Sequence, residues 1–263
     1  MQLGVSTASL FTRYKTEDAL TFLNKNGIKT AEVFLASFCE YKKKFGKKLD
    51  KVKGGVDVHS VHVLTTQYEP QLYSINERAR EDSFVILEDM LRCAKKIGAK
   101  YYTFHGTARL KKLPMKMDFD KIAATTQKII DVCAKYNVIL SYENVHWCYY
   151  NYVGFFTELK KRTEGLKGTL DLKQARLSGA TYIDFLNEMK EDLVTVHLSD
   201  VDENGKLCLP GKGITDFYDL FSRLSDVGFN GAALIESYPS DYSSETEIFD
   251  SLNFLEEISD KVF

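Results

Sequence analysis

The chain alternates between two patterns of hydrophobic and polar positions. Short apolar or β-branched runs, typical of buried strands, occur at residues 3–7, 30–35, 56–63, 100–105, 138–145, 166–171, 193–197 and 232–236. Longer segments with apolar residues at helical spacing separate them, at 16–26, 38–52, 77–97, 118–136, 154–161, 183–189, 217–224 and 244–258. Strict alternation indicates right-handed βαβ units and a parallel sheet. Eight units in 263 residues predict one α/β domain over residues 1–263, a closed (β/α)₈ TIM barrel.

Local signals predict several helix ends. Thr16, followed by two acidic residues, is expected to cap the first helix. Gly27 and Gly98 suit the left-handed position that ends a helix. The lysine-rich segment 38–52 has apolar residues on one stripe, so its lysines are interpreted as a solvated helix face rather than a nucleic-acid patch.

Each of the last four strands ends in a side chain that can bind a metal or transfer a proton. These side chains are Glu143, Asp171, His197 and Glu236. Because alternate residues of a strand face the same way, all four share the interior parity of their strands. The neighbouring residues on the other parity, Leu140, Leu170, Val196 and Ile235, are apolar and are expected to pack under the helices.

Active sites of such barrels lie at the carboxyl ends of the strands, where these four side chains would meet. Taken one at a time, a glutamate at a strand end is usually solvated and a histidine is usually a hydrogen-bonded core residue. Three carboxylates brought together would raise one another's pKa unless a cation neutralised them. Carboxylates with one imidazole suit a single divalent ion, Mn²⁺, Mg²⁺ or Zn²⁺.

Composition narrows the class of protein. Hydrophobic residues make up 44% and charged residues 27%, and the net charge is −2, which does not favour nucleic acid or an anionic membrane as a partner. The five cysteines include no C-x-x-C pair, which favours free thiols in a reducing compartment. Neither a secretory signal nor a membrane-spanning run is visible, so a cytoplasmic protein is expected.

The local motifs resemble those of the xylose isomerase-like barrel superfamily. The resemblance lies in Ser-Tyr-Glu143-Asn, Thr-Leu-Asp171, Val-His197-Leu-Ser-Asp, Leu-Pro-Gly-Lys-Gly, Leu-Ile-Glu236 and Phe-His105-Gly, and it covers essentially the whole chain. It implies a sugar or sugar-phosphate isomerase or epimerase with one divalent metal held by Glu143, Asp171, His197 and Glu236. It also implies that Glu143 and Glu236 are the acid–base pair, in an order left open, and that the reaction passes through a metal-stabilised enediolate.

The chain departs from this pattern at Gln174. Many relatives have a histidine three residues after the aspartate, whereas here the sequence is Asp171-Leu-Lys-Gln174. The ligands that the DNA-repair branch adds after the seventh strand are also missing, which argues against DNA repair. Two alternatives stay open: a lyase of the inosose dehydratase type, and a carbohydrate-binding barrel without turnover.

Other residues near the strand ends are candidates for contact with a sugar or sugar phosphate. Each also has a purely structural interpretation, as a core histidine, a salt-bridge partner or a packing residue. The predicted substrate-binding residues are His62, His105, Lys173, Gln174, Arg176 and Trp147. Glu32 is a further candidate for the pocket lining. The sequence leaves a homo-oligomeric assembly open.

Overall fold

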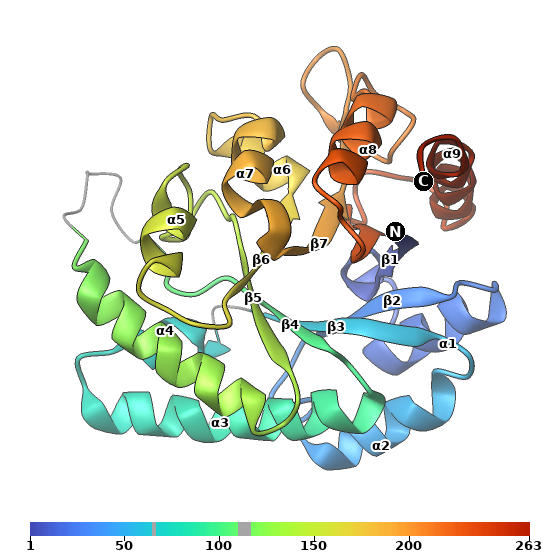
Figure 1. Cartoon of the computed structure of the whole chain (residues 1–263). Helices are drawn as coiled ribbons and strands as arrows, with labels where there is room; N and C mark the ends of the chain where they lie inside the picture. Colours follow the sequence, from blue (N-terminus) through green and yellow to red (C-terminus); the bar gives the residue numbers. More distant parts are fainter. Residues whose placement is uncertain (65–66, 110–116) are drawn as a thin grey trace.

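The computed structural model describes residues 1–64, 67–109 and 117–263. Its parallel strands close into a barrel in the order β1-β10-β7-β6-β5-β4-β3-β2 (Figure 1). The strands are β1 (Gln2–Ser6), β2 (Thr30–Leu35), β3 (Asp57–Val63), β4 (Tyr101–Phe104), β5 (Ile139–Glu143), β6 (Lys167–Asp171), β7 (Leu193–Leu198) and β10 (Ala232–Ile235). The predicted (β/α)₈ barrel is therefore confirmed.

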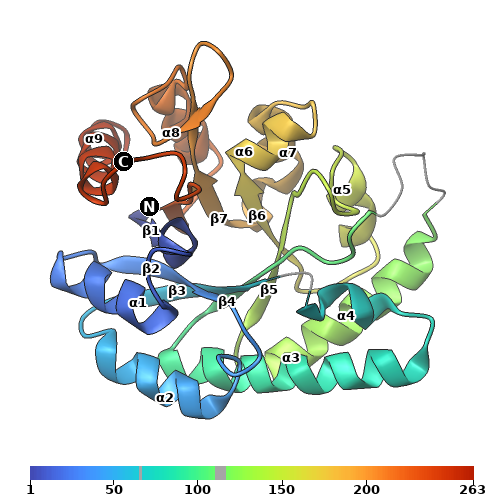
Figure 2. The same ribbon diagram turned by 180° about the vertical axis from the view of Figure 1, so that it is seen from behind.

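Helices surround the barrel, as the two opposite views in Figures 1 and 2 show. They are α1 (Thr16–Lys25), α2 (Lys43–Val52), α3 (Glu77–Ile97), α4 (Phe119–Ala134), α5 (Phe155–Lys160), α6 (Leu172–Leu177), α7 (Tyr182–Met189), α8 (Phe217–Asp226) and α9 (Thr246–Val262). Short 3₁₀ helices η1 (Thr7–Leu10), η3 (Glu69–Tyr73) and η4 (Lys190–Asp192) lie in the connections.

The connections on either side of β7 differ from the expected alternation of one strand and one helix. Two helices follow β6 instead of one, because Asp171 caps α6 directly at the strand end and Thr181 starts α7 with a capping box. After β7, the strands β8 (Asp200–Val201) and β9 (Leu207–Cys208) form an antiparallel hairpin before α8. The helix α6 and the β8–β9 hairpin lie at the carboxyl end of the barrel, beside the predicted site.

Some predicted helix ends are confirmed and others are wrong. Gly27 and Gly98 have φ of +78° and +83°, as a left-handed helix end requires. Thr16 is not the cap of α1: Lys15 is, and the Thr16 hydroxyl donates to Glu40. The α2 helix begins at Lys43 rather than Phe38.

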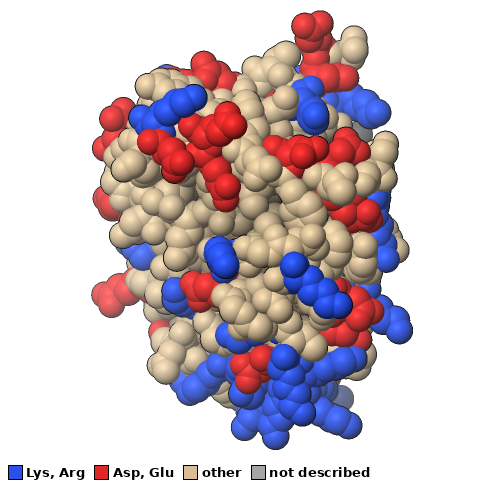
Figure 3. All heavy atoms as spheres, turned by 90° about the vertical axis from the view of Figure 1, so that its right-hand side faces the viewer, with Lys and Arg blue, Asp and Glu red and all other residues tan. Residues whose placement is uncertain are grey.

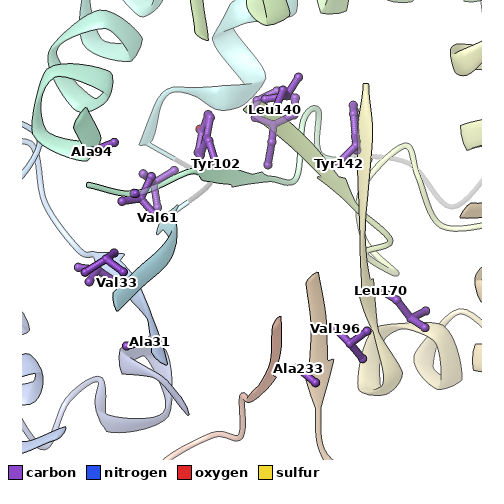
Figure 4. Packing of buried hydrophobic residues seen from close by; sticks show 14 of the residues in the cluster. Ala31, Val33, Val61, Ala94, Tyr102, Leu140, Tyr142, Leu170, Val196 and Ala233 are labelled. Carbon is purple, nitrogen blue, oxygen red and sulfur yellow. The ribbon is translucent and has the colours of Figure 1, made fainter. Parts of the chain in front are cut away.

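The hydrophobic core lies between the barrel and its helices. The strand residues that face outward are buried there, and Figure 4 shows several of them around the ring of strands. Leu140, Leu170, Val196 and Ile235 are all fully buried, so the predicted outer parity is confirmed.

The barrel interior holds a buried carboxylate surrounded by hydroxyl side chains. Glu32 is fully buried inside it and accepts hydrogen bonds from the hydroxyls of Ser6, Ser60 and Thr103 at 3.0, 2.8 and 2.6 Å. Small hydroxyl side chains leave room for one carboxylate in a volume that branched aliphatic residues usually fill. A negative charge is thereby held beneath the mouth of the barrel.

Lysines gather on one end of the surface, where α2 lies (Figure 3). Lys42 pairs with Asp89 and Lys48 with Glu17, Lys43, Lys44 and Lys47 are exposed, and Leu49 of the same helix is buried. This arrangement fits the predicted solvated helix face. All five cysteines are free. Among the described residues, none of the helices combines the length and the hydrophobicity needed to cross a membrane.

Candidate metal centre and active site

Four side chains that are far apart in the sequence meet at the carboxyl end of the barrel. Glu143 and Asp171 are the last residues of β5 and β6, His197 is near the end of β7, and Glu236 follows β10 directly. One oxygen or nitrogen atom from each lies within 4.8 Å of the others, and all four side chains are buried. The four predicted metal ligands are therefore brought together.

The imidazole of His197 lies at the centre of this group. Its Nδ1 atom is 3.0 Å from Glu236 Oε2, 3.3 Å from Glu143 Oε1 and 3.8 Å from Asp171 Oδ2. The opposite nitrogen, Nε2, lies 3.1 Å from Oε1 of Glu32 below. A carboxylate behind a histidine fixes the ring orientation and makes the other nitrogen a better ligand.

The two carboxylate oxygens of Asp171 have different roles: one caps a helix and the other faces the site. Oδ1 accepts the backbone N–H of Gln174 at 2.8 Å and so caps α6. Asn144 holds the backbone of Asp171 from both sides, at 2.8 and 2.9 Å. Oδ2 is buried and has no hydrogen-bond partner among the described residues. The nearest cationic groups, Nζ of Lys173 at 3.5 Å and Nδ1 of His197 at 3.8 Å, lie beyond ordinary hydrogen-bond distance, so this oxygen is open to a further cationic ligand.

Two histidines lie between the two glutamates. His62 Nδ1 is 3.4 Å from Glu236 Oε1, and its Nε2 is 2.9 Å from Nε2 of His105. His105 Nε2 is in turn 2.7 Å from Glu143 Oε2. The predicted substrate-binding residues His62 and His105 thus lie beside the candidate metal ligands.

A pocket of about 270 Å³ opens above this cluster. Glu143, Glu236, His62, His105, Lys173 and Gln174 contribute its polar surface. Its apolar surface includes Phe11, Phe34, Leu64, Trp147 and Tyr238. Gln174 also accepts a hydrogen bond from the backbone of His146 at 3.3 Å. Five of the six predicted substrate-binding residues therefore line one pocket.

Arg176 is the exception. It is exposed on α6 and lines a separate pocket of about 330 Å³, between α6, α7 and the β8–β9 hairpin. Lys173 is the one predicted contact that borders both pockets. Arg176 follows Asp171 by five positions, but its exposed side chain on α6 borders only the second pocket and not the one above the cluster.

The pKa values of the clustered side chains are shifted because these charged groups are buried close together. Burial opposes charge on Glu32 and Glu236, but the surrounding cationic groups together outweigh it and hold the pKa of both carboxyls well below the usual range: His197 and His62 act on both, and Lys173 acts on Glu236. Burial, together with the charges of Glu143 and Glu236, raises the pKa of Asp171 to about 7. The surrounding carboxylates raise the pKa of His197 well above that of a free imidazole, despite burial.

These residues fit a divalent cation. Three carboxylates and one imidazole form a hard, oxygen-rich ligand set, and Asp171 Oδ2 is an available buried acceptor. Carboxylate and imidazole ligands must be deprotonated to bind a metal, so binding would displace protons from this cluster.

Sequence reasoning missed two residues that shape the site. Buried Glu69, on η3, accepts the backbone N–H groups of His105 and Gly106 at 3.1 and 3.2 Å. Asp200 accepts those of Gly211 and Gly213 at 3.1 and 2.9 Å and so holds the loop after β9. Asp200 is the last residue of the His197 motif but was assigned no role, whereas nothing in the sequence around Glu69 points to β4.

Comparisons with known proteins agree with this geometry. No curated protein sequence matches the chain significantly. Among solved structures, the IOLI protein with a bound zinc atom has a TM-score of 0.81 at 16% identity, covering 100% of this chain and 99% of that one. A D-tagatose 3-epimerase-like protein has a TM-score of 0.79 at 18% identity, with 100% and 98% covered. A 3-keto-D-glucoside 4-epimerase from E. coli has a TM-score of 0.77 at 15% identity, with 98% and 99% covered. The sequence of residues 20–258 matches the xylose isomerase-like TIM barrel family. The chain therefore belongs to this family.

Proposed function

We propose that this protein is a divalent-metal-dependent sugar isomerase or epimerase. The observation that carries the proposal is the position of Glu143 and Glu236. They come from β5 and the end of β10, strands that β6 and β7 separate, yet both contribute to one four-residue cluster and both line the same pocket. Two carboxylates on different sides of a substrate are what a proton transfer from one face to the other requires.

In this proposal Glu143, Asp171, His197 and Glu236 hold one Mn²⁺, Mg²⁺ or Zn²⁺ ion. When bound, the ion supplies a Lewis acid that acidifies the C–H group next to a sugar carbonyl. One glutamate accepts the proton from that carbon. The other returns a proton to the opposite face, which inverts the centre, or a proton returns to the neighbouring carbon, which isomerises the sugar.

The rest of the pocket would orient the sugar. Gln174 and the histidines offer hydrogen bonds to hydroxyl groups, and Trp147 and Tyr238 offer apolar surface to the C–H face of a sugar ring. Arg176 would contact only a substrate that extends into the neighbouring pocket. The similar structures support a sugar as substrate, since they include a D-tagatose 3-epimerase-like protein and a 3-keto-D-glucoside 4-epimerase, and the IOLI protein has a bound zinc atom.

Solvent-hydrogen exchange tests this function. The protein is incubated with Mn²⁺ and a panel of ketoses in D₂O, and deuterium next to the carbonyl is measured by NMR. We expect exchange in the native protein and none in Glu143→Gln or Glu236→Gln. Exposed Glu164→Gln is the matched control and should keep full exchange.

Two other outcomes would contradict the proposal. Loss of water from the sugar without an isomerised product would favour a lyase. Measurable sugar binding with no exchange for any ketose would favour a carbohydrate-binding barrel without turnover.

A further inference from the structure

Lys173 is a buried lysine among the candidate metal ligands. Its side chain is only 4% exposed, although lysine is rarely buried without a charge partner. Its Nζ atom lies 3.5 Å from Asp171 Oδ2 and 3.6 Å from Glu236 Oε2. Both distances exceed those of ordinary hydrogen bonds, so the ammonium group attracts two carboxylates without being committed to either.

Local structure does not account for a lysine at this position. Lys173 is in the first turn of α6, where the helix dipole disfavours a positive charge. Burying an ammonium group is also unfavourable in itself. The ring of Tyr238, whose centroid lies 4.4 Å from Nζ, gives a further favourable contact. The carboxylates and this ring together explain why the side chain turns inward.

The same two oxygens face both the lysine and the proposed ion position. Asp171 Oδ2 and Glu236 Oε2, the oxygens nearest to Lys173, are also among those that surround Nδ1 of His197. A cation bound by His197 and these oxygens would therefore share its ligands with the ammonium group. Two positive charges near the same oxygens repel each other while each is attracted to the carboxylates.

The number of buried carboxylates leaves a role for a divalent ion and also for the ammonium group of Lys173. Glu32, Glu143, Asp171 and Glu236 are all buried around the site. One divalent ion offsets two of these four negative charges and leaves the others to nearby cations. Lys173 borders the cluster without occupying its centre, so it is suited to offset a third.

We propose that Lys173 is a resident cation of the metal centre. It holds Asp171 and Glu236 together when no ion is bound, and it weakens the binding of the ion through repulsion and shared ligands. The inference rests on the metal site of the proposed function. It concerns the affinity for the ion and does not depend on which sugar is turned over.

The test compares variants of the full-length protein after treatment with chelator. Lys173→Met removes the charge at similar length, and Lys173→Arg keeps it. Lys160→Met is the matched control, because Lys160 pairs with Asp192 and borders neither pocket. The dissociation constant for MnCl₂ is measured by calorimetry, and the melting temperature is measured with and without Mn²⁺.

We expect Lys173→Met to melt at a lower temperature than the native protein when metal-free, and to bind Mn²⁺ about tenfold more tightly or better. Its Mn²⁺-induced rise in melting temperature should exceed that of the native protein. Lys173→Arg and Lys160→Met should bind Mn²⁺ with the native constant to within about threefold. If Lys173→Met does not fold, Lys173→Gln is used in its place with the same expectation.

Equal or weaker Mn²⁺ binding by Lys173→Met would overturn the inference, as would an equal loss of melting temperature with and without the ion. A native protein that binds no Mn²⁺ would overturn both this inference and the metal-dependent function. Tighter binding by Lys173→Met together with no exchange in any ketose would support the inference and contradict the proposed function alone.

Discussion

Glu32 Oε1 lies 3.1 Å from Nε2 of His197, on the side of the imidazole that faces away from the three candidate carboxylate ligands. Glu32 is fully buried, and hydroxyl groups from β1, β3 and β4 hold its oxygens in place. The carboxylate therefore fixes the ring of His197 from below while Nδ1 faces the site. The candidate metal centre therefore extends one layer deeper into the barrel than the four proposed ligands.

Replacing Glu32 with Gln should weaken Mn²⁺ binding about 10- to 100-fold, the usual effect of losing a carboxylate behind a ligating histidine. The amide keeps the shape and one acceptor for the surrounding hydroxyls but loses the negative charge. Calorimetric titration with MnCl₂ measures the effect, and circular dichroism checks the fold. An unchanged dissociation constant in a folded variant would remove Glu32 from the metal centre.

Replacing Asp171 with Asn should separate the two roles of this side chain. The amide oxygen can still cap α6 in place of Oδ1, so the free energy of unfolding without metal should change by no more than about 1 kcal/mol. Mn²⁺ binding should weaken more than tenfold, because a charged ligand is lost. Chemical denaturation and metal titration measure the two quantities. A large loss of metal-free stability with native metal affinity would contradict the assignment.

Glu69 does not line the pocket itself, but its loss should reduce the stability of the fold. Its carboxylate accepts two backbone N–H groups and the hydroxyl of Tyr102, and all three donors are buried. Glu69→Ala would leave them unpaired and should reduce the free energy of unfolding by about 3 kcal/mol or more. Glu69→Gln keeps one acceptor oxygen at this position and should lose less. Urea denaturation measures the free energy of unfolding of the two variants. An equal loss in both would contradict the prediction.

His59 predicts a pH dependence of stability. It is buried inside the barrel, with Nε2 2.9 Å from the hydroxyl of Thr195, and burial lowers its pKa from 6.5 to about 4. Between these two values the unfolded chain binds a proton that the folded protein does not. The contribution of His59 to stability is therefore present above pH 6.5 and falls by about 2–3 kcal/mol as the pH drops to 4.

His59→Gln should flatten that part of the profile, because it removes the titrating group. Denaturation midpoints of the native and variant proteins between pH 7 and pH 4 provide the measurement. The difference between the two profiles isolates His59 from carboxylates that titrate in the same range. Parallel profiles would show that the pKa of His59 is the same in the folded and unfolded states.

Removal of bound metal should lower the melting temperature, since an ion that binds only the folded state stabilises it by mass action. At a free Mn²⁺ concentration 100 times the dissociation constant, the gain is about 2.7 kcal/mol. Thermal melts with excess chelator and with Mn²⁺ measure it, and Asp171→Asn should show little of the difference. A melting temperature that does not respond to Mn²⁺ in the native protein would contradict the metal site.

The sequence by itself determined the barrel and the four converging side chains. Both follow from periodicity: apolar residues on one parity of each strand must be covered by helices, which leaves the other parity, with Glu143, Asp171, His197 and Glu236, to face inward. The closed parallel barrel then brings the carboxyl ends of its strands together.

Only the tertiary structure decided the environment of those side chains. Glu69 contacts His105, which is 36 residues away in the sequence, and Glu32 contacts His197 across the barrel. No local sequence pattern predicts either contact. Lys173 is buried and borders both pockets, whereas Arg176 on the same short helix α6 is exposed and borders only the second pocket; this difference depends on how α6 packs at the end of β6. Periodicity fixes which face of an element a residue occupies, whereas the partner that it meets depends on how distant elements pack.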